Sequence, residues 1–293
     1  MEASVVIRTY NEARWLPPVF EALKRQDLDG RPWEVVVVDS GSTDETRALA
    51  EAAGARIVDI KKSEFTFGRS LNVGCAAARG RALVFISGHC IPVGERWLAD
   101  LIAPLGRDGV SYTYGRQVGH ELTKFSEHQL FAKYFPERSA VPQEGFFCNN
   151  ANAALLRSVW ETEPFDETLT GLEDMELAKR LVARGHRIGY VAEAPVIHIH
   201  EESWSRVKVR YEREAIALQA IMPEVHLSFG DFLRYTTSAV FLDWGEAIKA
   251  KCFLREAWPV VMFRTMQFWG AYRGNNDHRR LSQRKKEAYF YPR

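Results

Sequence analysis

The sequence lacks the patterns that mark several common classes of protein. Its four cysteines, Cys75, Cys90, Cys148 and Cys252, are far apart and form no CxxC pair, so neither a disulfide framework nor a zinc knuckle is indicated and a reducing compartment is favoured. No uninterrupted run of about 18 apolar residues occurs, so a membrane-spanning helix is not expected. The N-terminus enters a strand pattern without the segments of a secretory signal. We therefore expect a cytoplasmic protein.

Motifs for several phosphate-containing ligands are also missing. The sequence contains no P-loop and no G-x-G-x-x-G motif, so ATPases and dinucleotide oxidoreductases lose their main support. A net charge of +1 argues against a nucleic-acid partner, because neutralising many phosphates requires a clear basic excess. With 293 residues and 46% hydrophobic content, the chain can bury one large core.

Two short apolar runs each end in polar residues. Residues 34–39 read Glu-Val-Val-Val-Val-Asp, and four consecutive valines indicate a strand buried on both faces. Residues 4–8 form a second run of this kind. Ligands of such sheets bind at the carboxyl ends of the strands, so we predict a nucleotide pocket there. Its predicted residues are Thr9, Tyr10, Asn11 and Glu12 after the first run, and Asp39, Ser40 and Ser42 after the second. The alternative is a pair of ordinary strand-to-helix turns with capping residues.

Strand and helix patterns alternate through about residue 115. Strands are predicted at 4–8, 34–39, 55–60 and 82–86, and helices near 17–26, 43–53, 69–79 and 94–105. This order is typical of a parallel sheet whose strands are joined by crossover helices. Residues 116–200 are expected to complete the sheet.

Five segments, taken together and in order, resemble the family 2 glycosyltransferases of the GT-A fold. They are Val-Val-Ile-Arg-Thr-Tyr-Asn-Glu at 5–12, Val-Val-Asp-Ser-Gly-Ser-Thr-Asp at 37–44, and the stretches 67–74, 83–92 and 171–174. The resemblance covers about residues 3–215. Residues 114–117, 150–154 and 165–167 are most similar to the rhamnosyltransferase-like branch that builds bacterial surface polysaccharides.

The resemblance implies an α/β fold with a mostly parallel, Rossmann-like sheet flanked by helices. The domain would span residues 1–222, with a nucleotide-sugar half at 1–115 and an acceptor half at 116–222. Residues 223–293 would form a helical extension rich in aromatic and basic residues. The expected partners are a nucleoside-diphosphate sugar donor and a saccharide or lipid-linked saccharide acceptor. We expect these reactions at the cytoplasmic face of the inner membrane.

Glu173 and Asp174 are the predicted catalytic residues. Transfer with inversion requires a base within reach of the acceptor hydroxyl, and the resemblance assigns that role to Asp174. Glu173 would orient the acceptor or support the loop. A helical pattern follows the pair, so the alternative is that the two carboxylates stabilise the positive N-terminal end of a helix. The two roles are compatible.

The chain departs from the family at Ser87-Gly88-His89. Relatives commonly place an acidic motif there that binds a divalent cation, Mn or Mg, whereas this segment has no acidic residue. His89 stands where the metal-binding Asp is expected. On a strand, His198 and His200 would point to one face. Our hypothesis is that His89 and one of His198 or His200 flank the donor diphosphate, with or without a metal. The alternative is that these histidines are ordinary structural residues.

Further polar residues are weaker candidates for substrate contacts. Arg69 and Asn72 lie on one side of a predicted helix start, where a guanidinium suits a phosphate or a base. Arg116 is a similar but weaker candidate. Asn150 and Asn152 are predicted to contact the acceptor, although asparagine-rich turns are commonly structural.

The C-terminal region mixes aromatic and basic residues. Residues 229–273 carry eleven aromatic side chains and many apolar ones among lysines and arginines, a composition that suits helices lying at a membrane surface. The last twenty residues hold six Lys or Arg against two acidic residues, or 6 − 2 = +4, which anionic lipids would attract. The alternative is a helical subdomain or a dimer interface, and the sequence does not predict the oligomeric state.

Two other functions remain open. The missing acidic motif is compatible with a non-catalytic sugar-nucleotide-binding subunit of a polysaccharide assembly complex, although the Glu173-Asp174 pair weighs against it. A nucleotidylyltransferase is less favoured, because its usual glycine-rich basic loop after the first strand is replaced by residues 9–12.

Overall fold

A computed structural model describes residues 1–276 and 289–290, in two compact units. Unit 1 comprises residues 1–118, 135–168 and 173–199. Unit 2 comprises residues 119–134 and 169–172 together with the chain from residue 200 onward. The domain boundary placed after residue 222 stays a prediction.

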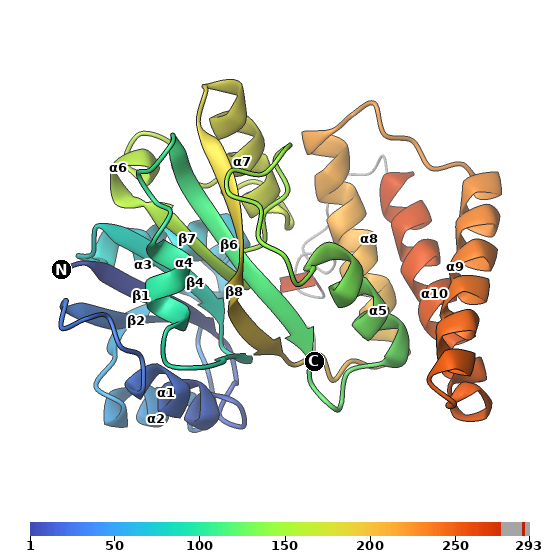
Figure 1. The fold of residues 1–293 in the computed structure, drawn as a ribbon, viewed down its shortest axis with the longest axis horizontal. Coiled ribbons are helices and arrows are strands. Elements are labelled where there is room, and N and C mark those ends of the chain that lie inside the picture. The colour runs from blue at the N-terminus through green and yellow to red at the C-terminus, as the bar shows by residue number, and fades with distance from the viewer. Residues whose placement is uncertain (277–288, 291–293) are drawn as a thin grey trace. The chain divides into compact units, whose positions relative to one another are not determined.

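The first half of unit 1 is a parallel sheet, as predicted. Its strands are β1 (Ala3–Thr9), β2 (Trp33–Asp39), β3 (Arg56–Asp59) and β4 (Ala82–Ser87), joined by α1 (Leu16–Lys24), α2 (Thr46–Ala52), the short η1 (Lys62–Glu64) and α3 (Phe67–Ala77) (Figure 1). Gly74 explains how closely α3 approaches the sheet, because a Cβ atom there would lie 2.4 Å from Val6 Cγ1. The valines of β1 and the last three valines of β2, Val36, Val37 and Val38, are almost completely buried, and Val35 is partly buried. The predicted buried central strands are confirmed.

The second half of unit 1 adds antiparallel pairs to the same sheet. Its elements are β5 (Cys90–Pro92), α4 (Trp97–Ile102), β6 (Val110–Gly119), β7 (Asn152–Leu156), α6 (Arg157–Trp160), α7 (Glu173–Ala183) and β8 (Arg187–His198). The strand order is β3-β2-β1-β4-β7-β6-β8-β5. Strand β7 runs antiparallel to β4, and β6 runs antiparallel to β7. The predicted α/β fold is confirmed, as a mixed sheet with flanking helices.

The strand that was predicted to carry both late histidines ends between them. Strand β8 ends at His198, so His200 lies two residues beyond the strand. Ile199 turns inward and is buried, and its backbone N–H donates to the carbonyl of His89. This hydrogen bond extends the antiparallel pairing of β8 with β5 by one position beyond the His198–Cys90 pair.

Unit 2 is helical. Its helices are α5 (Phe125–Tyr134), α8 (Trp204–Ile221), α9 (Phe229–Lys249) and α10 (Phe253–Asn275), and α10 packs against the other three. A Cβ atom at Gly270 would lie 2.3 Å from the Lys208 carbonyl oxygen, so this glycine allows α10 to lie directly on the backbone of α8. The helical C-terminal extension is confirmed. Among the described residues, no helix has both the length and the apolar character needed to cross a bilayer.

Candidate active site

Polar residues meet at the carboxyl ends of the parallel strands. The register places Thr9 of β1 beside Asp39 of β2, and Asp39 beside Asp59 of β3. Arg8 lies beside Ser87 of β4. Because parallel strands end at one edge of the sheet, these side chains share the edge where ligands of such folds bind.

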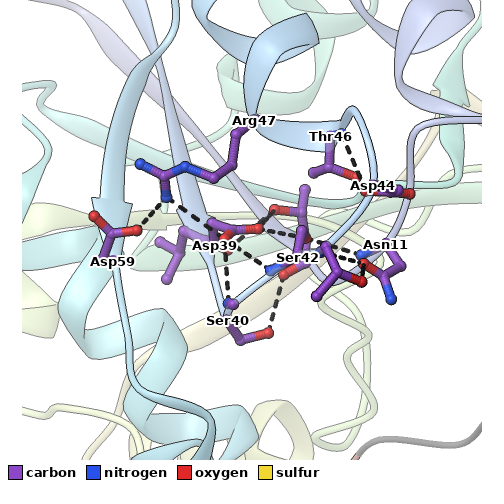
Figure 2. A network of polar contacts seen from close by, with 12 residues as sticks. Asn11, Asp39, Ser40, Ser42, Asp44, Thr46, Arg47 and Asp59 are labelled. Atoms are coloured by element: carbon purple, nitrogen blue, oxygen red, sulfur yellow. Dashed lines mark hydrogen bonds and ion pairs between the residues drawn. The ribbon is translucent and has the colours of Figure 1, made fainter.

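Hydrogen bonds join the two loops that follow β1 and β2 (Figure 2). Asn11 has a positive φ of 55°, and its side-chain oxygen accepts a hydrogen bond from the Thr43 backbone N–H at 2.8 Å. The Asn11 backbone N–H donates to Ser42 Oγ at 2.9 Å. The Glu12 backbone N–H donates to Thr46 Oγ1 at 2.8 Å. The predicted nucleotide-binding segments 9–12 and 39–42 are therefore one connected structure.

Asp39 is the centre of this structure and is only 1% exposed. Its Oδ1 accepts hydrogen bonds from Thr9 Oγ1 at 3.3 Å and from Ser42 Oγ at 2.5 Å, while its Oδ2 accepts from the backbone N–H groups of Gly41 and Ser42. Arg47 from α2 lies 3.6 Å from Oδ2 and also pairs with Asp59 (Figure 2). In this arrangement Asp39 fixes the β2–α2 turn, and its contact with a ligand stays a prediction.

Glu173 and Asp174 occupy the first turn of α7, as the sequence pattern predicted. Arg8 donates to Glu173 Oε1 at 3.1 Å and its guanidinium lies 5.3 Å from the centre of the Phe67 ring. Arg8 precedes Thr9, which donates to Asp39. A continuous chain of contacts through the end of β1 therefore links the catalytic candidates to the predicted nucleotide site within unit 1.

The environment of Asp174 shifts its pKa strongly. Burial raises the pKa, the neighbouring Glu173 carboxylate raises it further, and the result is a pKa of about 7 instead of 3.8. Backbone N–H donors oppose this, from Asn150 to Oδ2 at 2.7 Å and from Met175 to Oδ1 at 2.8 Å. A carboxylate whose pKa lies near neutrality can both accept and release a proton under ordinary conditions, which a general base requires.

A second layer of buried groups supports Asp174 through Asn150. The Tyr112 hydroxyl donates to Asn150 Oδ1 at 2.5 Å, and the Asn150 side chain is 2% exposed. Its Nδ2 has no hydrogen-bond partner among the residues that the structure describes, an uncommon condition for a buried amide. Tyr112 and the adjacent Cys148 thiol are themselves buried, which raises the pKa of both groups. Asn150 is thus held rigidly beside the candidate base with one donor left over.

His89, Glu12 and His198 meet at the end of β4. Glu12 Oε1 lies 2.8 Å from His89 Nδ1, and the imidazole rings of His89 and His198 stack with centres 5.3 Å apart. His198 Nδ1 lies 2.7 Å from Gln117 Oε1. His200 belongs to the same group, since the three predicted metal-binding histidines offer ligand atoms that all lie within 4.8 Å of one another.

The third histidine, His200, belongs to a charged cluster in unit 2. Its Nδ1 lies 2.6 Å from Glu127 Oε1, and Arg210 reaches both Glu127 at 2.5 Å and Glu202 at 2.8 Å. Glu127, His200 and Glu202 have ligand atoms close enough together to hold a metal ion. Arg210 already supplies positive charge to both carboxylates, so this cluster is satisfied without a metal ion.

The remaining candidates have structural partners. Asn72 uses its whole amide to hold the loop after α6, with Nδ2 donating to Phe165 O and Oδ1 accepting from Trp160 Nε1. Asn152 is completely buried in β7 and accepts from Trp97 Nε1. Arg69 pairs with Glu167 and Arg116 with Glu137, and within the described part of the chain each keeps a buried Nε without a hydrogen-bond partner. The Tyr10 hydroxyl accepts a hydrogen bond from Lys62 Nζ at 3.0 Å. Their contacts with substrate stay predictions.

Three residues of the site were missed in the sequence. Arg8 lies within a predicted strand and Arg47 within a predicted helix, where a basic residue carries no special signal. Their significance comes from Glu173 and Asp39, partners that only the fold brings near. Tyr112 likewise becomes relevant only through Asn150, which lies 38 positions later in the chain.

Comparison with known proteins agrees with the fold and the motifs. Residues 4–162 match the family model "Glycosyl transferase family 2". The O-antigen chain rhamnosyltransferases WbaN of Salmonella anatum and RfbN of Salmonella typhimurium are 29% and 27% identical over 240 and 242 residues, in each case 78% of this chain and about three quarters of the relative. The mannosyltransferase PcManGT of Pyrobaculum calidifontis, solved with GDP-Man and Mn²⁺, aligns with a TM-score of 0.62 at 17% identity, covering 92% of this chain and 84% of that protein.

Proposed function

The chain belongs to glycosyl transferase family 2, and on that premise we propose that it is an inverting hexosyltransferase whose general base is Asp174. The donor is a nucleoside-diphosphate sugar and the acceptor is a saccharide or a lipid-linked saccharide of a surface polysaccharide. The observation that carries this proposal is the buried Asp174, with a pKa of about 7, next to an Arg8–Glu173 pair at the end of β1. The acceptor class is supported by the O-antigen rhamnosyltransferase relatives.

The donor is proposed to lie across the carboxyl ends of β1 and β2. The connected loops at 9–12 and 39–42 offer hydroxyl, amide and carboxylate groups that suit a ribose and a base, and Tyr10 offers an aromatic face for stacking. Arg69, which is 42% exposed, supplies positive charge toward the leaving diphosphate. The buried Asp39 acts here mainly by keeping both loops in position.

In the proposed reaction, the acceptor oxygen attacks the anomeric carbon as the bond from that carbon to the diphosphate breaks on the opposite side. Asp174 accepts the hydroxyl proton, and the nucleoside diphosphate leaves with the bonding electrons. Glu173 accepts a hydrogen bond from Arg8, and its carboxylate raises the pKa of Asp174. The unpartnered Asn150 Nδ2 is a donor for a hydroxyl of the bound sugar.

His89 and His198 have the chemistry to hold a divalent cation near the diphosphate. In each ring Nδ1 contacts an oxygen acceptor, the Glu12 carboxylate or the Gln117 amide, which is the usual support for an imidazole that binds metal through Nε2. Imidazole suits Mn²⁺ and softer ions better than Mg²⁺. A bound cation would neutralise charge on the leaving diphosphate. Titration with Mn²⁺ of the unaltered chain and of the His89→Ala variant tests this assignment by affinity.

The Asp174→Asn variant tests the proposed function. Transfer from a labelled donor should fall by about 10²–10⁴-fold, because that is the usual contribution of a general base, while donor binding is kept. Asp108→Asn is the matched control, since Asp108 is exposed in a loop of the same unit and should leave transfer unchanged.

Retained transfer in Asp174→Asn would refute the base assignment. If the unaltered chain binds the donor but neither transfers nor hydrolyses its sugar, the alternative of a non-catalytic sugar-nucleotide-binding subunit is favoured. Formation of a sugar nucleotide from a sugar phosphate and a nucleoside triphosphate would instead indicate a nucleotidylyltransferase.

A further inference from the structure

Helices α9 and α10 form an antiparallel hairpin in unit 2. Ring pairs connect successive levels of the two helices: Phe229 with Tyr272, Phe232 with Trp269, Tyr235 with Phe268, and Trp244 with Phe253. The indole N–H of Trp244 also donates to the carbonyl of Ala257 at 3.0 Å. Much of the aromatic content of residues 229–273 is therefore used between the two helices, as in the alternative of a helical subdomain, and contact of this region with a membrane stays a prediction.

The exposed apolar side chains gather at the turn between α9 and α10 instead. Phe241, Leu242, Ile248, Leu254 and Trp258 are 62–95% exposed, and Leu254 is the most exposed of them at 95%. Every other exposed large apolar side chain among the described residues is no more than 53% exposed. Concentrated exposure of this kind marks an interaction surface, whereas apolar residues scattered singly do not.

Basic side chains surround the same turn. Lys249, Lys251 and Arg255 are exposed, with Glu246 and Glu256 as partners of Lys249 and Arg255. The three cations therefore exceed the two carboxylates, and Lys251 has no ion-pair partner within the part of the chain that the structure describes. A hollow of about 430 Å³ lies at the turn, lined by Ile248, Lys251, Cys252, Phe253, Leu254 and Arg255. Apolar walls with two cations match a lipid, whose headgroup is anionic and whose chains are apolar.

We propose that the α9–α10 turn, residues 241–258, inserts into the headgroup region of a membrane that contains anionic lipid. The apolar side chains would enter the boundary between headgroups and acyl chains, and Lys251 and Arg255 would contact lipid phosphates. A second copy of the chain fits less well, because a stable protein interface typically requires about 20–30 residues from each side. Membrane contact at this turn does not depend on the proposed function, whereas its use in presenting a lipid-linked acceptor rests on that function.

Vesicle flotation of the full chain tests the proposal. The unaltered protein should bind vesicles of phosphatidylcholine with phosphatidylglycerol and bind pure phosphatidylcholine more weakly. The double variant Leu254→Ser/Trp258→Ser should bind the anionic vesicles at least about tenfold more weakly, since two large side chains lose their burial. The double variant Lys251→Gln/Arg255→Gln should lose the preference for anionic lipid.

Leu233→Ser is the matched control. Leu233 is an exposed leucine of α9 that lies 16 residues before the end of the helix, which is roughly 24 Å along its axis. Its replacement should leave vesicle binding unchanged. Asp174→Asn should also bind vesicles normally, so a failure of catalysis and a failure of membrane contact give different results.

Three outcomes would overturn the proposal. The first is no binding of the unaltered chain to anionic vesicles, and the second is full binding by the Leu254→Ser/Trp258→Ser variant. The third is a concentration-dependent dimer in light scattering that this variant abolishes without any vesicle binding, which would assign the surface to a second copy.

Discussion

Asp174→Asn should remove a loss of unfolding free energy that the unaltered protein undergoes as the pH rises from about 4 to 7. Asp174 is buried and its pKa is about 7 instead of 3.8, so the folded state prefers the protonated carboxyl group. Below about pH 4 the group is protonated in both the folded and the unfolded state and contributes no difference. As the pH rises toward 7, the unfolded chain releases the proton while the folded chain keeps it, and the folded state loses stability.

The size of the effect follows from the shift. A change of about 3 pKa units corresponds to about 4 kcal/mol of unfolding free energy, all of it lost above pH 7. Asparagine does not titrate, so Asp174→Asn escapes this loss. Its amide cannot accept from both the Asn150 and the Met175 N–H groups, which costs about 1–3 kcal/mol at every pH. The difference between variant and unaltered protein should therefore rise by about 4 kcal/mol in favour of the variant between pH 4 and pH 8.

Urea unfolding followed by tryptophan fluorescence across this pH range measures the difference directly. Asp108→Asn, at an exposed position, is the matched control for the loss of one carboxylate. Transfer by the unaltered enzyme should rise with pH through an inflection near 7, as the base becomes ionised. A stability difference for Asp174→Asn that stays constant or falls as pH rises would refute the reasoning.

Three further predictions concern unit 2. Gly270→Ala should lower the free energy of unfolding by about 1–3 kcal/mol, because the added Cβ atom would clash with the backbone of α8. Gly245→Ala on α9 should raise it by about 0.5–1 kcal/mol, because the added Cβ atom there has open space, and thermal unfolding of both variants measures the difference. Arg264→Met should cost about 3–5 kcal/mol by leaving Asp243 buried and unpaired, and adding Asp243→Leu should restore most of this in denaturant unfolding. Burial raises the pKa of Glu127, but Arg210 and His200 outweigh this effect and lower the pKa to about 2. Glu127→Gln should therefore lower the free energy of unfolding by about 3 kcal/mol at pH 7. This loss should shrink as the pH falls from about 4.5 to 2, because the carboxylate of the unaltered protein is then protonated.

The local sequence pattern was sufficient to predict the strands of the parallel half of the sheet. The predicted strands at 4–8, 34–39 and 82–86 agree with β1, β2 and β4 to within one residue at each end, because buried apolar runs end abruptly at polar turns. Helix starts were also local, and Pro17 and Pro18 occupy the first turn of α1. These signals lie within a few residues of one another and need no tertiary information.

Long-range pairing was the part that sequence could not supply. The Arg8–Glu173 ion pair joins residues 165 positions apart, and the position of β7 between β4 and β6 brings Asn150 to Asp174. The aromatic residues of the C-terminal region are a second example. Composition alone could not predict which rings pack between α9 and α10 and which are exposed at the turn. All six basic residues of the last twenty positions lie outside the described residues, and their attraction to anionic lipid stays a prediction.

The absence of an acidic residue at 87–89 has a structural counterpart in Glu12. Gly88 lies so close to Glu12 that a Cβ atom there would be 3.0 Å from Glu12 Cγ, so a larger residue at 88 and the present Glu12 side chain compete for the same space. Glu12 in turn places its carboxylate 2.8 Å from His89 Nδ1. The end of β4 therefore has a carboxylate beside it after all, contributed by the loop after β1. The same loop is hydrogen-bonded to Thr46 at the start of α2. The polar groups at the ends of β1, β2 and β4 are therefore joined in one network of contacts.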